Sequence, residues 1–272
     1  MTAAAPAMLI DGRPATRIDA ADRGLQYGDG LFETVRWENG RVRWWPRHLQ
    51  RLTEGCRRLG IAAPDGAQLA GELAAVAAGR GRALLKLIVT RGPMRRRGYR
   101  PTGDETPTRI VSAHEWPAGD GAPLTLELSA ITLAHSPALA GIKHLNRLES
   151  VLAQREAARL GCEEVVMCGS RGEPVCGSMS NLIVCTEEGM VTPAVESAGV
   201  RGVLRSLALD AAQATGVPLA VATLSVEQLH SASAICCSNV RWGLRPADRF
   251  AGRALAADAR IARLQAWIDA QP

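Results

Sequence analysis

Segments with the periodicity of strands and of helices alternate along both halves of the chain, and this alternation restricts the possible folds more than any other feature. Residues 83–90 have the length and apolar content of a buried strand, whereas apolar residues three and four positions apart over 49–59 indicate a helix. The second half repeats the mixture, with an expected strand over 164–168 and helices over 145–160 and 200–214. We therefore expect an α/β protein of two mixed domains with a cleft between them.

The break between the two expected domains falls at residues 114–123. This stretch contains two prolines and two glycines and has no periodicity, which is typical of an interdomain linker. We place a smaller N-terminal domain at residues 1–113 and a larger C-terminal domain at residues 124–272. Within the first domain, Asn39-Gly40 predicts a hairpin that joins strands over 32–37 and 42–45.

Charge and apolar content exclude several classes of protein. The net charge is +5, and the chain has only one dense basic cluster, Arg95-Arg96-Arg97 with Arg100, which has a single neighbouring aromatic residue, Tyr99. Nucleic-acid binding usually needs a longer basic stripe with interleaved aromatics, so we do not expect it. The longest apolar runs fall short of the roughly 18 residues of a membrane span, and no signal peptide is expected at the N-terminus.

The seven cysteines contain no C-x-x-C pair and lie in stretches that otherwise indicate apolar strands or helices. This distribution is typical of reduced core thiols and predicts a cytoplasmic protein without a metal site.

Lysine is almost absent from the chain. Lys86 and Lys143 are the only lysines, and arginine fills the other thirty of the 32 basic positions. Only an amine can lose its proton and form an imine, so a lysine retained against this bias is a candidate for covalent chemistry. Lys143 precedes an expected helix beside the expected cleft, and Lys86 interrupts an expected strand. A solvated lysine at a helix start remains the alternative for Lys143.

Four motifs occur in a fixed order along the chain. They are Gly28-Asp29-Gly30-Leu31-Phe32-Glu33-Thr34, His48-Leu49-Gln50-Arg51-Leu52, Ile142-Lys143-His144-Leu145-Asn146-Arg147-Leu148 and Ser180-Asn181-Leu182. Their order and spacing resemble the fold-type IV pyridoxal phosphate (PLP) enzymes from about residue 9 to residue 246. This family contains the branched-chain and D-amino acid aminotransferases and the aminodeoxychorismate lyases. The run Lys-x-Leu-Asn-Arg-Leu resembles the lyases more than the aminotransferases.

The resemblance implies a PLP cofactor in the cleft of a D-amino acid aminotransferase-like fold. Lys143 would carry its Schiff base and act as the catalytic base, while Lys86 is expected to be structural. Arg51 matches the family's arginine for the cofactor phosphate. The run 202–205 resembles a helix start at which the backbone of Val203 and Leu204 binds that phosphate. Ser238 and Asn239 lie where the family often has a further polar ligand.

One position departs from the family pattern. The family usually has a glutamate five residues before the asparagine of the Ser-Asn-Leu motif, where it pairs with the pyridine nitrogen of the cofactor. That position is Cys176 here, and Glu173 lies three residues earlier. Because a shift of three residues reverses the face of a strand, we expect Cys176 at the ring nitrogen. A weakly acidic partner there should impair transamination more than elimination of pyruvate.

The basic run from Arg91 to Tyr99 resembles a loop of the lyases that faces the substrate. Arg97 and Tyr99, and less strongly Arg91, are the expected contacts for the substrate carboxylates, although a solvated basic loop remains the alternative. The implied function is the conversion of 4-amino-4-deoxychorismate to 4-aminobenzoate and pyruvate, a step toward folate. A branched-chain or D-amino acid aminotransferase and a non-enzymatic binding module remain alternatives. The family also implies a homodimer.

Overall fold

The computed structural model describes residues 7–117 and 124–272, and the chain divides into two compact units. One unit is built from residues 1–118 together with 142–146, and the other from residues 119–141 and 147–272. Both units mix helices with a sheet, which confirms the expected α/β class. The short segment 142–146, which contains Lys143, groups with the N-terminal unit. Most of the expected linker at residues 114–123 lies outside the described residues.

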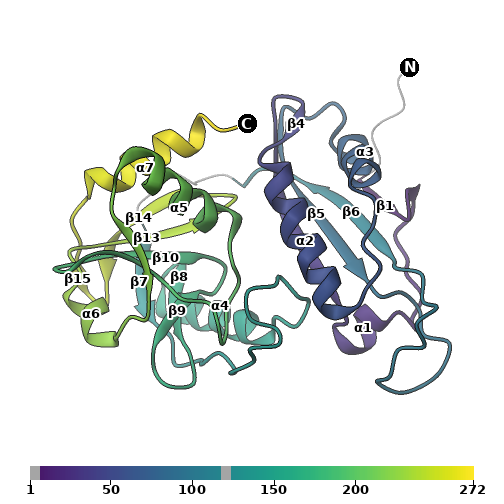
Figure 1. The fold of residues 1–272 in the computed structure, drawn as a ribbon, viewed down its shortest axis with the longest axis horizontal. Helices are drawn as coiled ribbons and strands as arrows, with labels where there is room; N and C mark the ends of the chain where they lie inside the picture. Colours follow the sequence, from purple (N-terminus) through teal and green to yellow (C-terminus); the bar gives the residue numbers. More distant parts are fainter. Residues whose placement is uncertain (1–6, 118–123) are drawn as a thin grey trace. The chain divides into compact units, whose positions relative to one another are not determined.

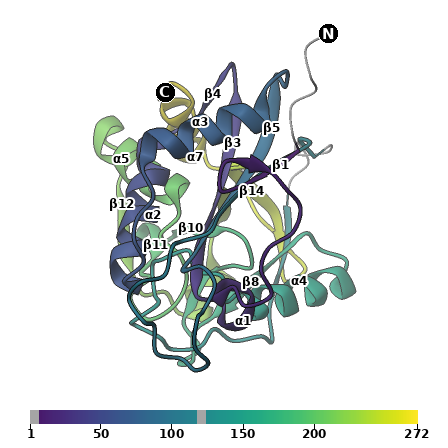
Figure 2. The same cartoon turned by 90° about the vertical axis from the view of Figure 1, so that its right-hand side faces the viewer.

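The first unit contains a six-stranded sheet in the order β2-β1-β6-β5-β3-β4, in which every neighbouring pair is antiparallel. Its strands are β1 (Met8–Ile10), β2 (Arg13–Pro14), β3 (Gly30–Glu38), β4 (Arg41–Val42), β5 (Arg82–Thr90) and β6 (Arg109–His114). Its helices are α1 (Arg23–Tyr27), α2 (Trp45–Leu59) and α3 (Gly66–Ala77). Helix α2 packs against β3, and α3 packs against β4, β5 and β6 (Figures 1 and 2).

Strand β3 alternates between a buried and a more open face. Leu31 and Val35 are buried, and their partners on β5, Val89 and Leu85, are buried on the same face. The hairpin predicted at Asn39-Gly40 is confirmed by the antiparallel pairing of β3 with β4. The second predicted strand is too long, however, because Trp45 begins helix α2, where a proline in the first turn favours helix.

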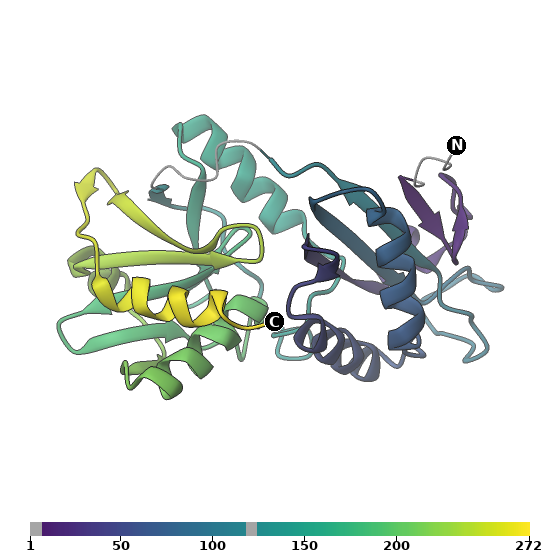
Figure 3. The same ribbon diagram turned by 90° about the horizontal axis from the view of Figure 1, so that it is seen from above.

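The second unit is built on a nine-stranded sheet in the order β12-β11-β10-β13-β14-β7-β8-β9, with β15 paired to β14. Its strands are β7 (Leu124–Leu128), β8 (Glu164–Cys168), β9 (Pro174–Gly177), β10 (Asn181–Thr186), β11 (Gly189–Pro193), β12 (Leu219–Ala222), β13 (Ala234–Asn239), β14 (Gly243–Phe250) and β15 (Arg253–Ala254). Its helices are α4 (Leu148–Leu160), α5 (Val203–Thr215), α6 (Val226–Ser231) and α7 (Ala259–Asp269). Helices α5 and α7 pack on each other and against β13 and β14 (Figure 3).

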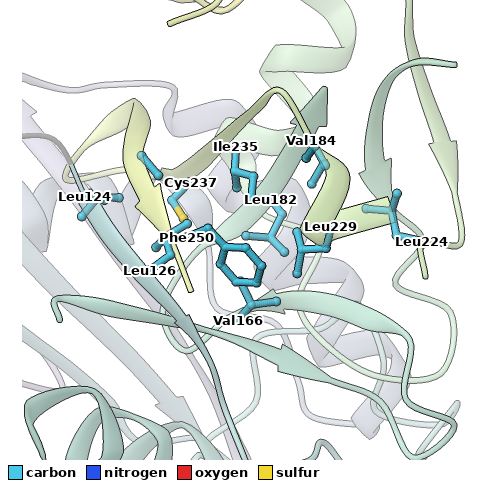
Figure 4. Close-up of a cluster of buried hydrophobic side chains, with 12 residues drawn as sticks. Leu124, Leu126, Val166, Leu182, Val184, Leu224, Leu229, Ile235, Cys237 and Phe250 are labelled. Carbon is cyan, nitrogen blue, oxygen red and sulfur yellow. The ribbon is translucent and has the colours of Figure 1, made fainter. Parts of the chain in front are cut away.

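The core of the second unit forms between several strands of this sheet and α6. Phe250 and Leu182 are fully buried in it, together with Leu229 of α6 (Figure 4). At about 25 cal/mol per Å² of buried apolar surface, such side chains contribute roughly 1.5–3 kcal/mol each. The predicted strand over 164–168 is confirmed in full. All five of its residues are buried, as is typical of a strand that is covered on both faces.

Helix α4 begins at Leu148 and not at residue 145 as its periodicity predicts. Leu145 does not join the helix, because its amide donates to the carbonyl oxygen of Gly30 at 3.0 Å. No helix among the described residues is both long and apolar enough to cross a membrane.

Candidate active site

Lys143 lies in a short extended segment that pairs with the beginning of β3. The amide of Phe32 donates to the carbonyl oxygen of Lys143 at 2.9 Å, and Leu31 and His144 form an antiparallel bridge. On the other side of this bridge the Leu145 amide donates to Gly30. The motifs that begin at Gly28 and at Ile142 therefore form one antiparallel ladder, although they lie far apart in the sequence.

The glycines of the first motif allow this close approach. A Cβ atom on Gly30 would lie 2.6 Å from the carbonyl oxygen of Val89 and 2.8 Å from Cδ1 of Leu145. Gly28 has a φ of +65°, and a Cβ there would lie 2.5 Å from Oδ1 of Asn146, whose amide group donates to the Gly28 carbonyl at 3.2 Å. Glycine is therefore required at both positions for steric reasons.

The side chain of Lys143 is directed to the more open face of β3. Its Nζ lies 4.2 Å from the centre of the Phe32 ring, a cation–π distance. Lys86 has its Nζ 5.5 Å from the same ring, and it lies on β5 opposite Thr34. The two lysines differ in exposure, because Lys143 is half-buried and Lys86 is exposed.

Arg51 belongs to a buried cluster with Glu33 of β3 and His48 of α2. The guanidinium of Arg51 donates to both carboxylate oxygens of Glu33, at 2.8 and 2.5 Å, and Nδ1 of His48 lies 2.7 Å from Glu33. Burial alone would raise the pKa of Glu33, but the charge of Arg51 and these hydrogen bonds lower it to about 2. Glu33 is therefore ionised at neutral pH and fixes the orientation of Arg51.

His48 completes this cluster. It is fully buried, and burial lowers its pKa, an effect that the positive charges of Arg51 and Lys143 increase and Glu33 opposes. Its Nε2 has no hydrogen-bond partner in the part of the chain that the structure describes. Sequence reasoning left Glu33 and His48 out of the site. The signal that could have found Glu33 is a charged residue in the apolar row of Leu31 and Val35.

The three candidate residues of the basic loop, Arg91, Arg97 and Tyr99, have different surroundings in the structure. Arg91 is buried and donates to Asp29 as well as to the carbonyl oxygens of Leu59 and Gly60 at the end of α2. These contacts give Arg91 a structural role, so it is the least available of the three for a substrate. Arg97 and Tyr99 are exposed, and Tyr99 retains 83% of its surface.

In the second unit, the N-terminus of α5 has the properties of an anion site. Gly202 precedes the helix with an extended backbone, no described side chain caps it, and its first turn contains no acidic residue. A Cβ on Gly202 would lie 2.0 Å from Oδ1 of Asn181, whose amide group donates to the carbonyl oxygen of Val200. The helix dipole and the amides that begin at Val203 and Leu204 favour an anion here.

Ser238 and Asn239 end strand β13 beside this asparagine. Ser238 is buried and donates to the carbonyl oxygen of Asn181 at 3.4 Å. The side chain of Asn239 accepts from the amides of Arg241 and Trp242, which closes the turn between β13 and β14. Asn239 therefore shapes this turn, and Ser238 holds Asn181 in place.

Cys176 and Glu173 lie in different surroundings. Cys176 is a buried member of β9 in an apolar cluster, where burial raises the pKa of its thiol to about 12. Glu173 lies outside the strand, in the preceding turn, and accepts from the amide of Arg171 at 3.1 Å. The thiol of Cys176 is thus neutral at physiological pH, and the carboxylate of Glu173 is engaged in its own turn.

Glu164 is a buried carboxylate that sequence reasoning missed. It accepts from the amides of Val165, Ser178 and Met179, at 3.0, 2.9 and 3.2 Å, and from the hydroxyl groups of Ser178 and Ser180. It therefore organises the turn that joins Cys176 to Asn181. Among the described residues, no group of His, Cys, Asp or Glu side chains could hold a metal ion.

Comparisons with known proteins agree with this geometry. Residues 30–250 match the model of the amino-transferase class IV family. The crystal structure of 4-amino-4-deoxychorismate lyase from Pseudomonas aeruginosa has a TM-score of 0.89 and 40% identity, and the match covers 95% of this chain and 97% of that one. The aminodeoxychorismate lyase of Vibrio harveyi is 30% identical over 87% of this chain and 89% of its own length. A D-alanine aminotransferase of Listeria monocytogenes is 27% identical, with 90% and 86% covered.

Proposed function

Because the chain belongs to the amino-transferase class IV family, we propose that it is a PLP-dependent lyase that converts 4-amino-4-deoxychorismate to 4-aminobenzoate and pyruvate. The observation that carries this proposal is the high similarity, over nearly the whole chain, to a solved lyase. It is supported by the run Lys143-His144-Leu145-Asn146-Arg147-Leu148, which resembles the lyases. The short ladder between this run and β3 gives the lysine a fixed backbone.

Each unit contains residues whose chemistry fits a part of the cofactor. Lys143 would hold it covalently through the side-chain amine, and the uncapped N-terminus of α5 would receive its phosphate at the amides of Val203 and Leu204. Arg51 would contribute a second phosphate contact, with its orientation set by Glu33. Ser238 would contribute indirectly, because its hydroxyl group donates to the carbonyl oxygen of Asn181 and holds that residue in place. When bound, the cofactor withdraws electrons from the substrate carbon that bears the amine.

Lys143 would also move the proton. Its Nζ would accept a proton from the substrate carbon that bears the amine. Loss of this proton and departure of pyruvate leave an aromatic ring, so the reaction needs no second substrate.

The dicarboxylate substrate would be bound by the exposed loop that contains Arg97 and Tyr99. A guanidinium pairs with a carboxylate through two parallel hydrogen bonds, and a phenol can donate a third. Both side chains are exposed and available for such contacts.

The neutral thiol of Cys176 favours the lyase over an aminotransferase of the same fold. We propose that this thiol faces the pyridine nitrogen, where a carboxylate would keep the ring protonated. Transamination depends on that protonated ring more than elimination does, because elimination is driven by formation of the aromatic product. Relatives named as a D-alanine aminotransferase and a putative branched-chain-amino-acid aminotransferase keep transamination of D-amino acids or branched-chain amino acids as the alternative.

Product identification tests the proposed function. The purified protein is mixed with aminodeoxychorismate generated in situ, without a keto acid. We expect 4-aminobenzoate and pyruvate in equal amounts. A strict requirement for a keto acid acceptor, with no pyruvate in its absence, would show an aminotransferase instead.

The two lysines provide a matched control for the cofactor. The Lys143→Ala protein should be colourless and inactive, whereas Lys86→Ala should keep the visible absorbance of the bound cofactor and its sensitivity to borohydride. The reverse pattern would assign the cofactor to Lys86. A colourless wild-type protein that binds the substrate would favour a non-enzymatic binding module.

Localisation and assembly complete the proposal. All seven cysteines are free and six of them are buried, which supports a reducing, cytoplasmic location. A homodimer is proposed from the family resemblance alone. Size-exclusion chromatography with light scattering would test it, and a monomer at micromolar concentration would contradict it.

A further inference from the structure

Arg23 is a buried arginine whose guanidinium contacts two segments far apart in the sequence. Its Nε donates to Oδ2 of Asp29 at 2.8 Å, Nη1 donates to the carbonyl oxygen of Gly98 at 3.1 Å and Nη2 to that of Tyr99 at 2.7 Å. The side chain is only 4% exposed. Arg23 therefore joins the first sequence motif to the loop that contains Arg97 and Tyr99.

The Asp29 end of this connection lies next to the Lys143 segment. Asp29 stands between Gly28 and Gly30, and both of these glycines accept hydrogen bonds from that segment, at 3.2 Å from Asn146 and 3.0 Å from Leu145. The amide of Asp29 also donates to the carbonyl oxygen of Arg23 at 3.2 Å. The loop and the lysine segment are thus fixed to the same turn.

Aromatic contacts strengthen the loop end of the connection. The guanidinium of Arg23 lies 5.0 Å from the centre of the Tyr27 ring, and the rings of Tyr27 and Tyr99 are 5.3 Å apart. The start of the loop is attached as well, because the amide of Met94 donates to the carbonyl oxygen of Ala21 at 3.0 Å. Residues 21–27 therefore support the loop at two places, at Met94 and at Gly98–Tyr99.

Charge balance explains why Arg23 needs the loop. Asp29 accepts from both Arg23 and Arg91, so a single carboxylate serves two buried guanidiniums. Burial alone would raise the pKa of Asp29, but hydrogen bonds from Arg91 and Arg23 lower it, and the carboxylate is ionised. The remaining donors of Arg91 go to carbonyl oxygens at the end of α2, and those of Arg23 go to the loop. Without these loop carbonyls, buried N–H groups of Arg23 would lose their partners, which is destabilising.

We infer that Arg23 is a positioning residue for substrate binding, which holds Arg97 and Tyr99 at a fixed place relative to the Lys143 segment through the carbonyl groups of Gly98 and Tyr99. This inference rests on the proposed function, because it assumes that the loop contacts a carboxylate substrate. Arg23 itself touches neither substrate nor cofactor. Its effect is to reduce the entropy lost when the loop binds an anion.

The first experiment measures loop order without any catalysis. Limited proteolysis with trypsin reports access to the bonds after Arg95, Arg96 and Arg97, and mass spectrometry identifies the cut sites. Arg23→Leu should increase cleavage in this loop by about tenfold or more, because local opening becomes cheaper by more than 1.4 kcal/mol. Loop cleavage in Arg23→Lys should lie between that of the wild type and that of Arg23→Leu, since one amine can replace only some of the three donors. Arg57→Leu is the matched control, since Arg57 is exposed and pairs with Glu54 within α2.

The second experiment separates substrate binding from chemistry. Arg23→Leu should raise the KM for aminodeoxychorismate by about tenfold or more and leave kcat within about threefold. The visible absorbance of the bound cofactor should stay unchanged, and Arg23→Lys should recover part of the KM. A purely structural role would instead lower the unfolding midpoint and the cofactor content and would not separate KM from kcat.

Each outcome decides a different question. Unchanged tryptic cleavage of the loop in Arg23→Leu overturns the inference, and so does a loss of kcat with a normal KM. If the wild-type protein shows no lyase activity, the proposed function fails, and the proteolysis still decides whether Arg23 orders the loop. Should Arg23→Leu fail to fold, Tyr27→Leu replaces it. That variant removes the ring contacts to Arg23 and Tyr99 and should increase loop cleavage, and no increase would overturn the inference.

Discussion

Phe32 and Lys143 lie opposite each other in an antiparallel pair, with the amide of Phe32 2.9 Å from the carbonyl oxygen of Lys143 and the lysine Nζ 4.2 Å from the centre of the phenyl ring. The backbone of Lys143 is therefore held by strand β3 and not by a helix of its own. Lys143 belongs to the first compact unit, whereas the helix start at Val203 belongs to the second. The position of the lysine thus depends on the glycines with which its segment pairs.

Gly30→Ala tests this dependence. The added methyl group would lie 2.6 Å from the backbone of Val89 and 2.8 Å from Cδ1 of Leu145, so the pairing of β3 with β5 must shift and the Leu145 side chain of the Lys143 segment must move. We expect a loss of about 1–3 kcal/mol in the free energy of unfolding, as for other overpacked sites, and a reduced cofactor content. Denaturant unfolding and visible absorbance measure the two effects. Gly81→Ala is the control, because nothing lies within 4 Å of the Cβ there, and equal effects of the two variants would contradict the explanation.

The buried cluster of Glu33, His48 and Arg51 predicts a pH dependence of stability. The pKa of Glu33 is about 2 in the folded protein, below the ordinary 4.5. A carboxylate with a lowered folded pKa stabilises the protein fully above its unfolded pKa and loses this contribution as the pH falls toward the folded pKa. The free energy of unfolding should therefore fall between about pH 5 and pH 2, by at most about 3 kcal/mol from this group.

Glu33→Gln separates this contribution from that of other carboxylates. The variant removes the carboxylate that pairs with the charge of Arg51, so at pH 7 it should be less stable by about 3 kcal/mol or more. Its stability should then change less with pH over the acid range than that of the wild type. Urea unfolding at several pH values measures both effects, and parallel pH curves for the two proteins would rule out Glu33 as the source.

Local patterns of the sequence predict much of this fold. The spacing of Leu49, Leu52 and Cys56 predicts α2, and the apolar runs predict β5 and β8, because each pattern depends only on neighbours along the chain. The ordered motifs also predict the family. Lys143 and the helix start after Gly202 follow from matching those motifs.

Contacts between distant segments could not be predicted in the same way. The periodicity of α4 extends back to residue 145, but the amide of Leu145 bonds to Gly30, and the helix starts later. The resemblance of its loop to a substrate loop makes Arg91 a weaker candidate for substrate contact than Arg97 and Tyr99, but it does not predict that Arg91 binds Asp29 and the end of α2. Most of the donors that surround Glu164 come from residues 178–180, which only the pairing of β8 with β9 brings close.

Glu164→Gln tests the role of this second buried carboxylate. An amide group can accept through only one oxygen, and its NH2 would face donors from Met179 and Ser180. We expect a loss of about 2–4 kcal/mol in the free energy of unfolding, typical of a disrupted buried network. Glu163→Gln on the neighbouring residue is the control. Glu163 is 54% exposed and pairs with Arg245, so that change should cost less than about 1 kcal/mol.

Cys176 offers the sharpest test of why this chain should favour elimination. Its thiol is buried and its pKa is raised to about 12, so it supplies no negative charge. In Cys176→Glu a carboxylate would pair with the pyridine nitrogen and stabilise its protonated form. We expect the ratio of D-alanine transamination to pyruvate elimination to rise by about tenfold or more, equivalent to 1.4 kcal/mol between the two barriers. Both rates are measured on protein saturated with the cofactor.

Cys176→Ser controls for the change of side chain at this position. A hydroxyl group is also neutral at physiological pH, so the serine variant should keep the ratio of the wild type, even if both rates fall. The comparison is made with the cofactor bound, because a glutamate placed without a partner in the apolar cluster around Val175 and Met167 is costly. If the glutamate and serine variants show the same ratio, the charge at position 176 does not determine the reaction. The choice between lyase and aminotransferase must then lie in the substrate loop around Arg97.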